Sequence, residues 1–114
     1  MQTIIAIIKP GDTGFAVANL QDALLVLLEH QIIKTFDTPN RPSLEELKKL
    51  TEMLKPERDQ SSFGDATRQL LIYFQNQQGL GDNLHGIVEE KTAATLNAVL
   101  KKIGIVVPAD EVQM

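Results

Sequence analysis

Four segments of this chain carry apolar residues at helical spacing, and this pattern constrains the fold more than any other feature. Apolar residues three or four positions apart share one face of a helix and can bury it against a core. The predicted inward residues are Val17, Leu20, Leu24, Leu27 and Leu28; Leu44, Leu47, Leu50 and Leu54; Leu70, Leu71 and Phe74; and Leu96, Val99, Leu100 and Ile103. We therefore expect helices over 15–29 or 15–30, 43–55, 65–78 and 89–103, which makes the domain all-α.

Polar residues mark the expected starts of the first two helices. Asp12 or Thr13 can supply the side-chain oxygen that caps the first helix. Ser43 followed by Glu46 is the capping-box pattern, in which each side chain bonds the other's backbone amide. Along the second helix, the pairs Glu45/Lys49 and Lys48/Glu52 are spaced for weak surface ion pairs.

Proline and glycine mark the expected ends. Pro56 is predicted to end the second helix, with a loop over 57–62. Gly79 and Gly104 follow the third and fourth helices, where a left-handed residue commonly closes a helix.

The two ends of the chain are predicted to be extended. Residues 3–8 are rich in β-branched side chains and stop at a Lys-Pro-Gly turn, while residues 105–107 lie between a glycine and a proline. These two segments can pair as a minimal ribbon, although two strands alone are marginally stable in water.

Composition excludes several classes of protein. The 114 residues suit one domain, and 43% hydrophobic residues are typical of a globular chain. The chain has no cysteine and only two histidines, so a zinc site would need mainly carboxylate ligands, which is uncommon. A net charge of −4 disfavours nucleic acid as a partner. No nucleophile–base pair or phosphate-binding loop is visible, so we expect no enzyme, no catalytic residue, no metal and no cofactor.

The N-terminal apolar run does not look like an export signal. No positive charge precedes it, Lys9 and Pro10 end it, and it is shorter than the roughly 20 apolar residues of a membrane span. We expect no membrane insertion. The localisation stays open: the chain can be cytoplasmic, exported by a non-standard route, or part of a larger protein.

Two junctions before helices share one layout. Phe63 is followed four residues later by Thr67, and Val88 is followed four residues later by Thr92, each in a helix's first turn. The apolar residue can pack back onto the first turns, and the threonine hydroxyl can serve backbone groups left open at the helix start. The predicted core depends on a core-facing helix beginning at each of the two junctions.

These junctions and the segments around them resemble the peptidoglycan-binding-like domain family. The residues that carry the resemblance are, in chain order, Gly11, Gly14, Val17, Leu20, Gln21, Leu24, Phe63, Gly64, Thr67, Phe74, Gln75, Gly79, Leu80, Gly86, Val88, Thr92 and Leu96. The resemblance covers residues 11–30 and 61–100. It implies an orthogonal three-helix bundle without catalytic residues, attached to cell-wall proteins. A related fold contacts protein in the pro-segment of matrix metalloproteases.

The chain departs from that family in its middle. Residues 31–60 insert an extra helix where the family has a short connection, and Ser61, Glu89 and His85 stand where the family has Gly, Gly and Asp. The domain is therefore predicted to comprise an extended arm over 1–10, the helical domain over 11–104 with this insertion, and a tail over 105–114.

Five residues are candidates for ligand contact, each with a structural alternative. Arg68 can grip a carboxylate of a peptidoglycan stem peptide or pair with Asp65 on the surface. Tyr73 can stack on a sugar or pack half-buried, and His85 can donate to a ligand or be a plain loop residue. Gln75 matches a family position, like Gln21, and can instead make a polar contact between helices.

Two functional hypotheses follow from the sequence. The first is a non-catalytic module that recognises bacterial cell-wall peptidoglycan, which the ordered motif favours. The second is a protein-interaction or structural module inside a larger toxin, phage-tail-like or secretion assembly, which the acidic charge, the absence of Trp and the inserted helix favour.

Overall fold

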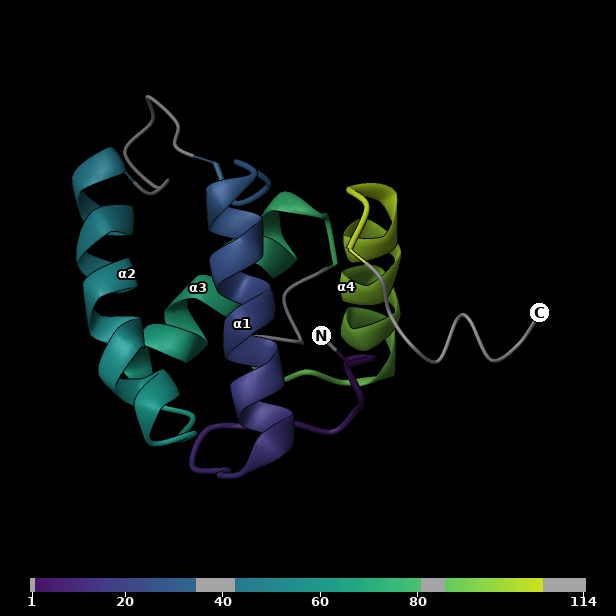
Figure 1. Cartoon of the computed structure of the whole chain (residues 1–114). Coiled ribbons are helices and arrows are strands. Elements are labelled where there is room, and N and C mark those ends of the chain that lie inside the picture. The colour runs from purple at the N-terminus through teal and green to yellow at the C-terminus, as the bar shows by residue number, and fades with distance from the viewer. Residues whose placement is uncertain (1, 35–42, 81–85, 106–114) are drawn as a thin grey trace.

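The computed structural model describes residues 2–34, 43–80 and 86–105. These residues form four helices and no strand: α1 (Phe15–Glu29), α2 (Leu44–Asp59), α3 (Asp65–Gln77) and α4 (Glu90–Lys102) (Figure 1). The all-α prediction is confirmed, and the bounds agree with the expected helices within a few residues except at the end of α2. Residues 106 and 107 and His85 lie outside the described residues.

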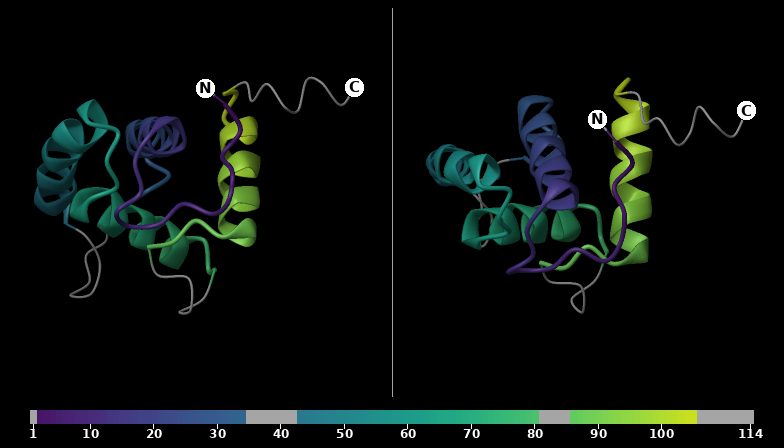
Figure 2. Two further views of the ribbon diagram at one scale, coloured as in Figure 1. Left: turned by 90° about the horizontal axis from the view of Figure 1, so that it is seen from below. Right: turned by 60° about the horizontal axis from the view of Figure 1, so that its bottom comes forward.

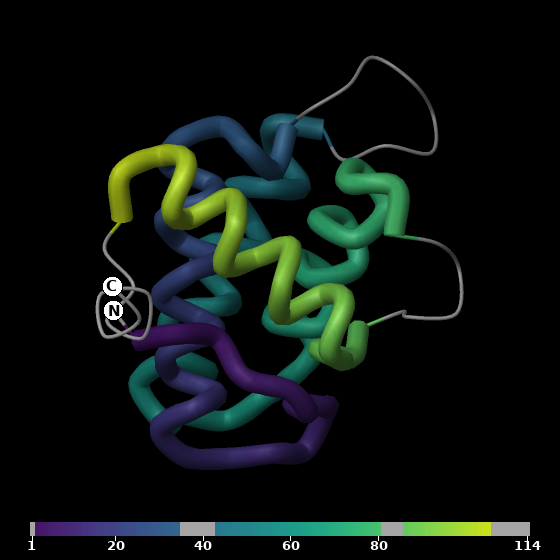
Figure 3. Tube along the Cα trace, turned by 90° about the vertical axis from the view of Figure 1, so that its right-hand side faces the viewer, coloured from purple at the N-terminus to yellow at the C-terminus, as the bar shows by residue number. Residues whose placement is uncertain are grey.

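The helices are arranged around α1, which contacts each of the other three. α2 lies beside α1, and α3 crosses at the base of both (Figure 2). α4 stands on the opposite side of α1 from α2, and the N-terminal segment runs along it (Figures 2 and 3). α2 thus forms one outer layer of the bundle.

The core contains the predicted apolar faces. Leu20, Leu70 and Leu96 are fully buried in one cluster, and Phe63 and Val88 are buried there too. Burial of such side chains stabilises the fold by roughly 1.5–3 kcal/mol each. Leu47, Leu50 and Leu54 of α2 are also buried as expected, whereas the prediction for Leu44 is wrong: its side chain is 59% exposed. Leu44 is the first residue of α2, one turn before the helix meets the core.

Pro56 does not end α2, contrary to the prediction. The helix continues through it to Asp59. A proline removes one intrahelical bond, but here the last turn is held by tertiary contacts. Arg58 donates to the Asp22 carboxylate of α1 at 2.6 and 3.2 Å, and Glu57 accepts hydrogen bonds from the start of α3.

The expected caps are confirmed for α2 and wrong for α1. Ser43 Oγ accepts from the Glu46 amide at 3.1 Å, but the return bond from Glu46 is absent among the described hydrogen bonds. Gly14 begins α1 without a side-chain cap, because Asp12 bonds the Lys9 amide instead. The surface pairs expected along α2 are absent among the described ion pairs, and the pair described within this helix joins Lys55 to Glu52.

We call the N-terminal segment, residues 2–8, the arm. Contrary to the prediction, the arm does not pair with Ile105. Its partner is Val88: the two backbone hydrogen bonds between Ile8 and Val88 measure 3.1 and 2.8 Å. Ile105 instead donates to the Leu100 carbonyl at the end of α4. A second bridge joins Thr13 to Ser62, so the chain before α1 lies against both predicted junctions.

Candidate functional site

The junction before α4 is organised by Gln75, which is fully buried. Its Nε2 donates to the Ile87 carbonyl at 2.9 Å and the Thr92 hydroxyl at 3.2 Å, and its Oε1 accepts from the Gly86 amide at 2.9 Å. Every polar atom of this buried amide is therefore satisfied within the protein. The structure places Gln75 in the interior, where it joins α3 to the turn before α4.

Glu89 completes this junction as the N-cap of α4. Its carboxylate accepts from the amides of Lys91 and Thr92 and from the Thr92 hydroxyl, at 3.0, 2.6 and 2.6 Å. These bonds to the ionised form lower the pKa of Glu89, the Thr92 hydroxyl contributing most. The Thr92 hydroxyl thus links a buried amide to a capping carboxylate, which is a different role from the expected bond to open backbone groups.

The junction before α3 repeats this arrangement with Gln21. Its Nε2 donates to the Ser62 carbonyl at 2.9 Å and the Thr67 hydroxyl at 3.0 Å. Its Oε1, although buried, has no partner among the described residues. The amide that would correspond to Gly86 belongs to Ser61, and it donates to the Arg58 carbonyl at the end of α2. The Ser61 amide is therefore used by the end of α2 and does not donate to Gln21.

The carboxylate of this first junction comes from α2. Glu57 accepts from the amides of Gly64, Ala66 and Thr67 and from the Thr67 hydroxyl, at 3.2, 2.9, 2.9 and 2.7 Å. A Cβ placed on Gly64 would lie 2.7 Å from this carboxylate. Position 64 corresponds to position 89, so the carboxylate fills the space that a side chain at the cap would need. The sequence did not reveal Glu57, because its spacing from Thr67 belongs to no local motif.

Arg68 and Asp65 are the candidate residues that lie at the surface. Both are exposed in the first turn of α3, but no ion pair joins them within the described part of the chain. The aliphatic stem of Arg68 lies over the backbone of Gly86, whose Cβ position is 2.6 Å from Arg68 Cγ. Ile87, next in the chain, is 38% exposed. The exposed Arg68 side chain therefore lies over the turn that leads into the second junction.

Tyr73 lies apart from Arg68. It is half-buried and packs on the core cluster. Burial, followed by interaction with the Glu46 carboxylate of α2, raises the pKa of Tyr73 to about 12. The structure therefore brings Asp65 and Arg68 together, places Gln75 inside, and turns Tyr73 toward α2.

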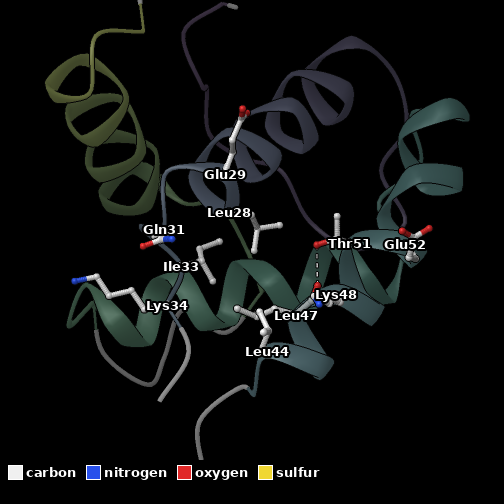
Figure 4. Close-up of a pocket in the computed structure, with 10 residues that line it drawn as sticks. All are labelled: Leu28, Glu29, Gln31, Ile33, Lys34, Leu44, Leu47, Lys48, Thr51 and Glu52. Atoms are coloured by element: carbon white, nitrogen blue, oxygen red, sulfur yellow. Dashed lines mark hydrogen bonds between the residues drawn. The ribbon is translucent and has the colours of Figure 1, made fainter. Parts of the chain in front are cut away.

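The sequence also missed a hollow of about 740 Å³ between α1 and α2 (Figure 4). Leu28, Ile33, Leu44 and Leu47 supply its apolar lining. Its charged side chains are Glu29, Lys34, Lys48 and Glu52. Two of these side chains are acidic and two are basic, so the lining has no net charge.

The chain was compared with known protein families, with curated proteins and with solved structures, and none of the three comparisons gave a match. Among residues 2–34, 43–80 and 86–105, no cluster of three His, Cys, Asp or Glu side chains could hold a metal ion. Within the same residues, no helix has the length and hydropathy needed to cross a bilayer.

Proposed function

We propose that this domain is a non-catalytic module that binds bacterial cell-wall peptidoglycan. The proposal draws on the sequence resemblance, and one observation carries it. Several residues of the motif, Gln21 with Thr67 and Gln75 with Thr92, meet as buried pairs in two matching junctions. A motif whose members hold one scaffold together is more specific than the same residues scattered in a fold. In this proposal α1, α3 and α4 form the three-helix module and α2 is inserted.

The surface proposed for ligand contact is the start of α3 with the adjoining turn. Arg68 presents a planar cation there, with its stem over Gly86, and Asp65 adds an acceptor one turn away. A guanidinium binds a carboxylate through two parallel hydrogen bonds, which suits the carboxylates of a stem peptide. The absence of Trp makes the peptide part of the wall polymer the better target than its sugars.

The proposal is tested by retention on purified sacculi. Arg68→Met removes the charge but keeps an aliphatic stem over Gly86, so the fold is expected to persist by circular dichroism. Lys102→Ala is the charge-matched control, since this exposed lysine lies at the far end of α4. Retention of the wild type and the control with loss of Arg68→Met supports the proposal. Equal retention of both variants contradicts the site, and no retention of the wild type contradicts the function.

A second candidate function is a protein-interaction or structural module in a larger toxin, phage-tail-like or secretion assembly. Exposed apolar side chains on and beside the arm favour it: Ile5, Ile7 and Phe15 are 57, 68 and 70% exposed. Exposed apolar clusters commonly mark protein contacts. This alternative would be established if the wild type is not retained on sacculi but co-purifies with a defined subunit of such an assembly.

A further inference from the structure

The arm lies between α1 and α4 and is held there by two asparagine side chains. Asn19 of α1 accepts from the Gln2 amide at 3.1 Å and donates to the Gln2 carbonyl at 2.9 Å. Asn97 of α4 accepts from the Ile4 amide at 2.8 Å and donates to the Ile4 carbonyl at 2.9 Å. Each carboxamide thus pairs with both backbone groups of one residue, as a neighbouring strand would.

Apolar contacts and one backbone bridge complete the site between α1 and α4 that holds the arm, which we call the seat. Ile4 and Ile8 are each only 2% exposed, and Ile8 exchanges two hydrogen bonds with Val88. The chain is anchored again from Gly11 onward, where the Gly11 amide donates to the Phe63 carbonyl. Lys9 and Pro10, which connect these two anchored parts, are exposed. The arm is therefore a well-packed segment joined to the bundle by a short exposed connection.

The outer side of the arm is apolar as well. Ile5 and Ile7 point away from the core, and Phe15 begins α1 a few residues after the connection. Ile5 and Phe15 line a hollow of about 360 Å³ whose other lining residues, Gln2, Thr3, Ala16 and Asn19, are uncharged. The lining of this hollow carries no charged side chain, so no local charge opposes the approach of a second copy at this surface.

We propose that two copies of this chain exchange their arms, so that residues 2–8 of each copy occupy the seat between α1 and α4 of the other. Exchange reproduces the contacts that the arm makes in its own chain. It requires that the Lys9–Pro10 connection open, which breaks the two hydrogen bonds between Lys9 and Asp12. It also brings the connections of the two copies together, and the exposed Ile7 and Phe15 on either side of each connection become buried. These new contacts favour the dimer over the closed monomer. The proposal does not depend on the proposed wall-binding function.

For each seat, the arm of a second copy competes with the chain's own attached arm, whose effective concentration is in the millimolar range. The exchanged dimer is therefore expected to become populated as the protein concentration approaches that range, or wherever copies are held close together.

A mixture of two single-cysteine variants tests the exchange, because the chain has no cysteine of its own. Ile8→Cys and Val88→Cys place thiols across a bridged pair, within the usual disulfide distance. The double variant, oxidised when dilute, is the geometric control and yields an internally bonded monomer. The two single variants, one carrying a mass tag, are then mixed when concentrated and oxidised. A disulfide that joins position 8 of one chain to position 88 of the other, in a yield that rises with concentration, supports the proposal.

The second measurement needs no cysteine and addresses the new interface. Sedimentation of the wild type is expected to show a monomer–dimer equilibrium, and Ile7→Ser with Phe15→Ser should weaken it about tenfold or more, given the apolar area removed. Leu44→Ser with Met53→Ser is the matched control, because these two apolar side chains of α2 are also exposed and lie away from the arm.

Three results would overturn the proposal. One is a wild type that stays monomeric up to about millimolar concentration, the effective concentration of the attached arm. Another is a dimer that forms equally well in the variant without Ile7 and Phe15. The third is a dimer whose mixed single-cysteine variants give no bond between positions 8 and 88.

Discussion

The two junctions of this domain make the same set of contacts with differently placed residues. In both, a buried glutamine bonds a backbone carbonyl and a threonine hydroxyl, and that hydroxyl donates to a carboxylate that caps a helix. Before α4 the carboxylate is Glu89, at the cap itself. Before α3 it is Glu57, from the end of α2. The comparison shows that both helix starts receive a carboxylate at the same point relative to the threonine, although different positions in the sequence provide it.

The difference also explains how α2 belongs to the bundle. Because Glu57 occupies the space beside Gly64, the cap of α3 depends on another helix, whereas the cap of α4 is local. The ion pair between Arg58 and Asp22 ties the same turn of α2 to α1. Removal of α2 would therefore be expected to uncap α3 as well as expose its apolar face.

The largest expected effect concerns the two glutamines. Gln75→Met leaves a buried Gly86 amide and an Ile87 carbonyl without their partner and removes one of the two hydrogen bonds of the Thr92 hydroxyl, so we expect a loss of about 3 kcal/mol in the free energy of unfolding. Gln21→Met removes two bonds but also a carbonyl oxygen that is unpaired in the described structure, so about 1 kcal/mol is expected. Urea denaturation measures both. Equal losses would contradict the inferred asymmetry.

The next effect concerns the capping carboxylates. Glu57→Ala removes four hydrogen bonds between α2 and the start of α3 and is expected to cost about 2 kcal/mol. Glu89→Ala removes a local cap and is expected to cost about 1 kcal/mol.

A transplanted carboxylate sharpens this second prediction. Gly64→Glu alone should destabilise the fold, since its Cβ meets Glu57, while Gly64→Glu combined with Glu57→Ala should recover part of the loss of Glu57→Ala. Thermal unfolding of the three variants provides the ranking. A double variant no more stable than Glu57→Ala would show that position 64 cannot host the cap.

A smaller effect is expected at the left-handed residue of each junction. Ser61 has a φ of 50°, and the matching Gly86 has a φ of 75°. Ser61→Gly is expected to stabilise the fold by about 0.5–1 kcal/mol, because glycine adopts this conformation without steric cost. Gly86→Ala should do the reverse and also displace the stem of Arg68. Differential scanning calorimetry would reveal the opposite signs, and a stabilised Gly86→Ala would contradict the equivalence.

The smallest effect is the pH dependence of the local cap. The pKa of Glu89 is lowered in the folded state, so its carboxylate stabilises the fold fully above the ordinary value of 4.5, and this contribution is lost as the pH falls through the folded-state pKa. Glu89→Gln should therefore flatten the decline of stability below about pH 4.5 relative to wild type. Parallel curves for the two proteins would contradict the assignment.

The sequence predicted the helices and most of the core, because those depend on residues a few positions apart. The burial of Leu20, Leu70 and Leu96 followed from helical periodicity, and Gly79 and Gly104 take positive φ angles of 69 and 89° as expected after helix ends. The predictions from sequence were wrong where several groups compete for one hydrogen-bond partner. Asp12 bonded Lys9 in a turn and left Gly14 at the start of α1 without a side-chain cap.

The candidate site divides in the same way. Asp65 and Arg68 lie at the surface as residues in an amphipathic first turn should, whereas the interior position of Gln75 depends on the turn at Gly86 folding back onto α3. The periodicity of apolar residues within a helix does not predict where the chain folds back onto another helix.

What the sequence determined by itself was which segments become helices and which faces they bury, since apolar spacing acts within each segment. Tertiary structure alone decided that Glu57 caps α3, that α2 runs past Pro56, and that the arm pairs with Val88. The reason is physical: a buried hydroxyl or amide must find a partner, and the nearest partner in space is set by how the helices pack.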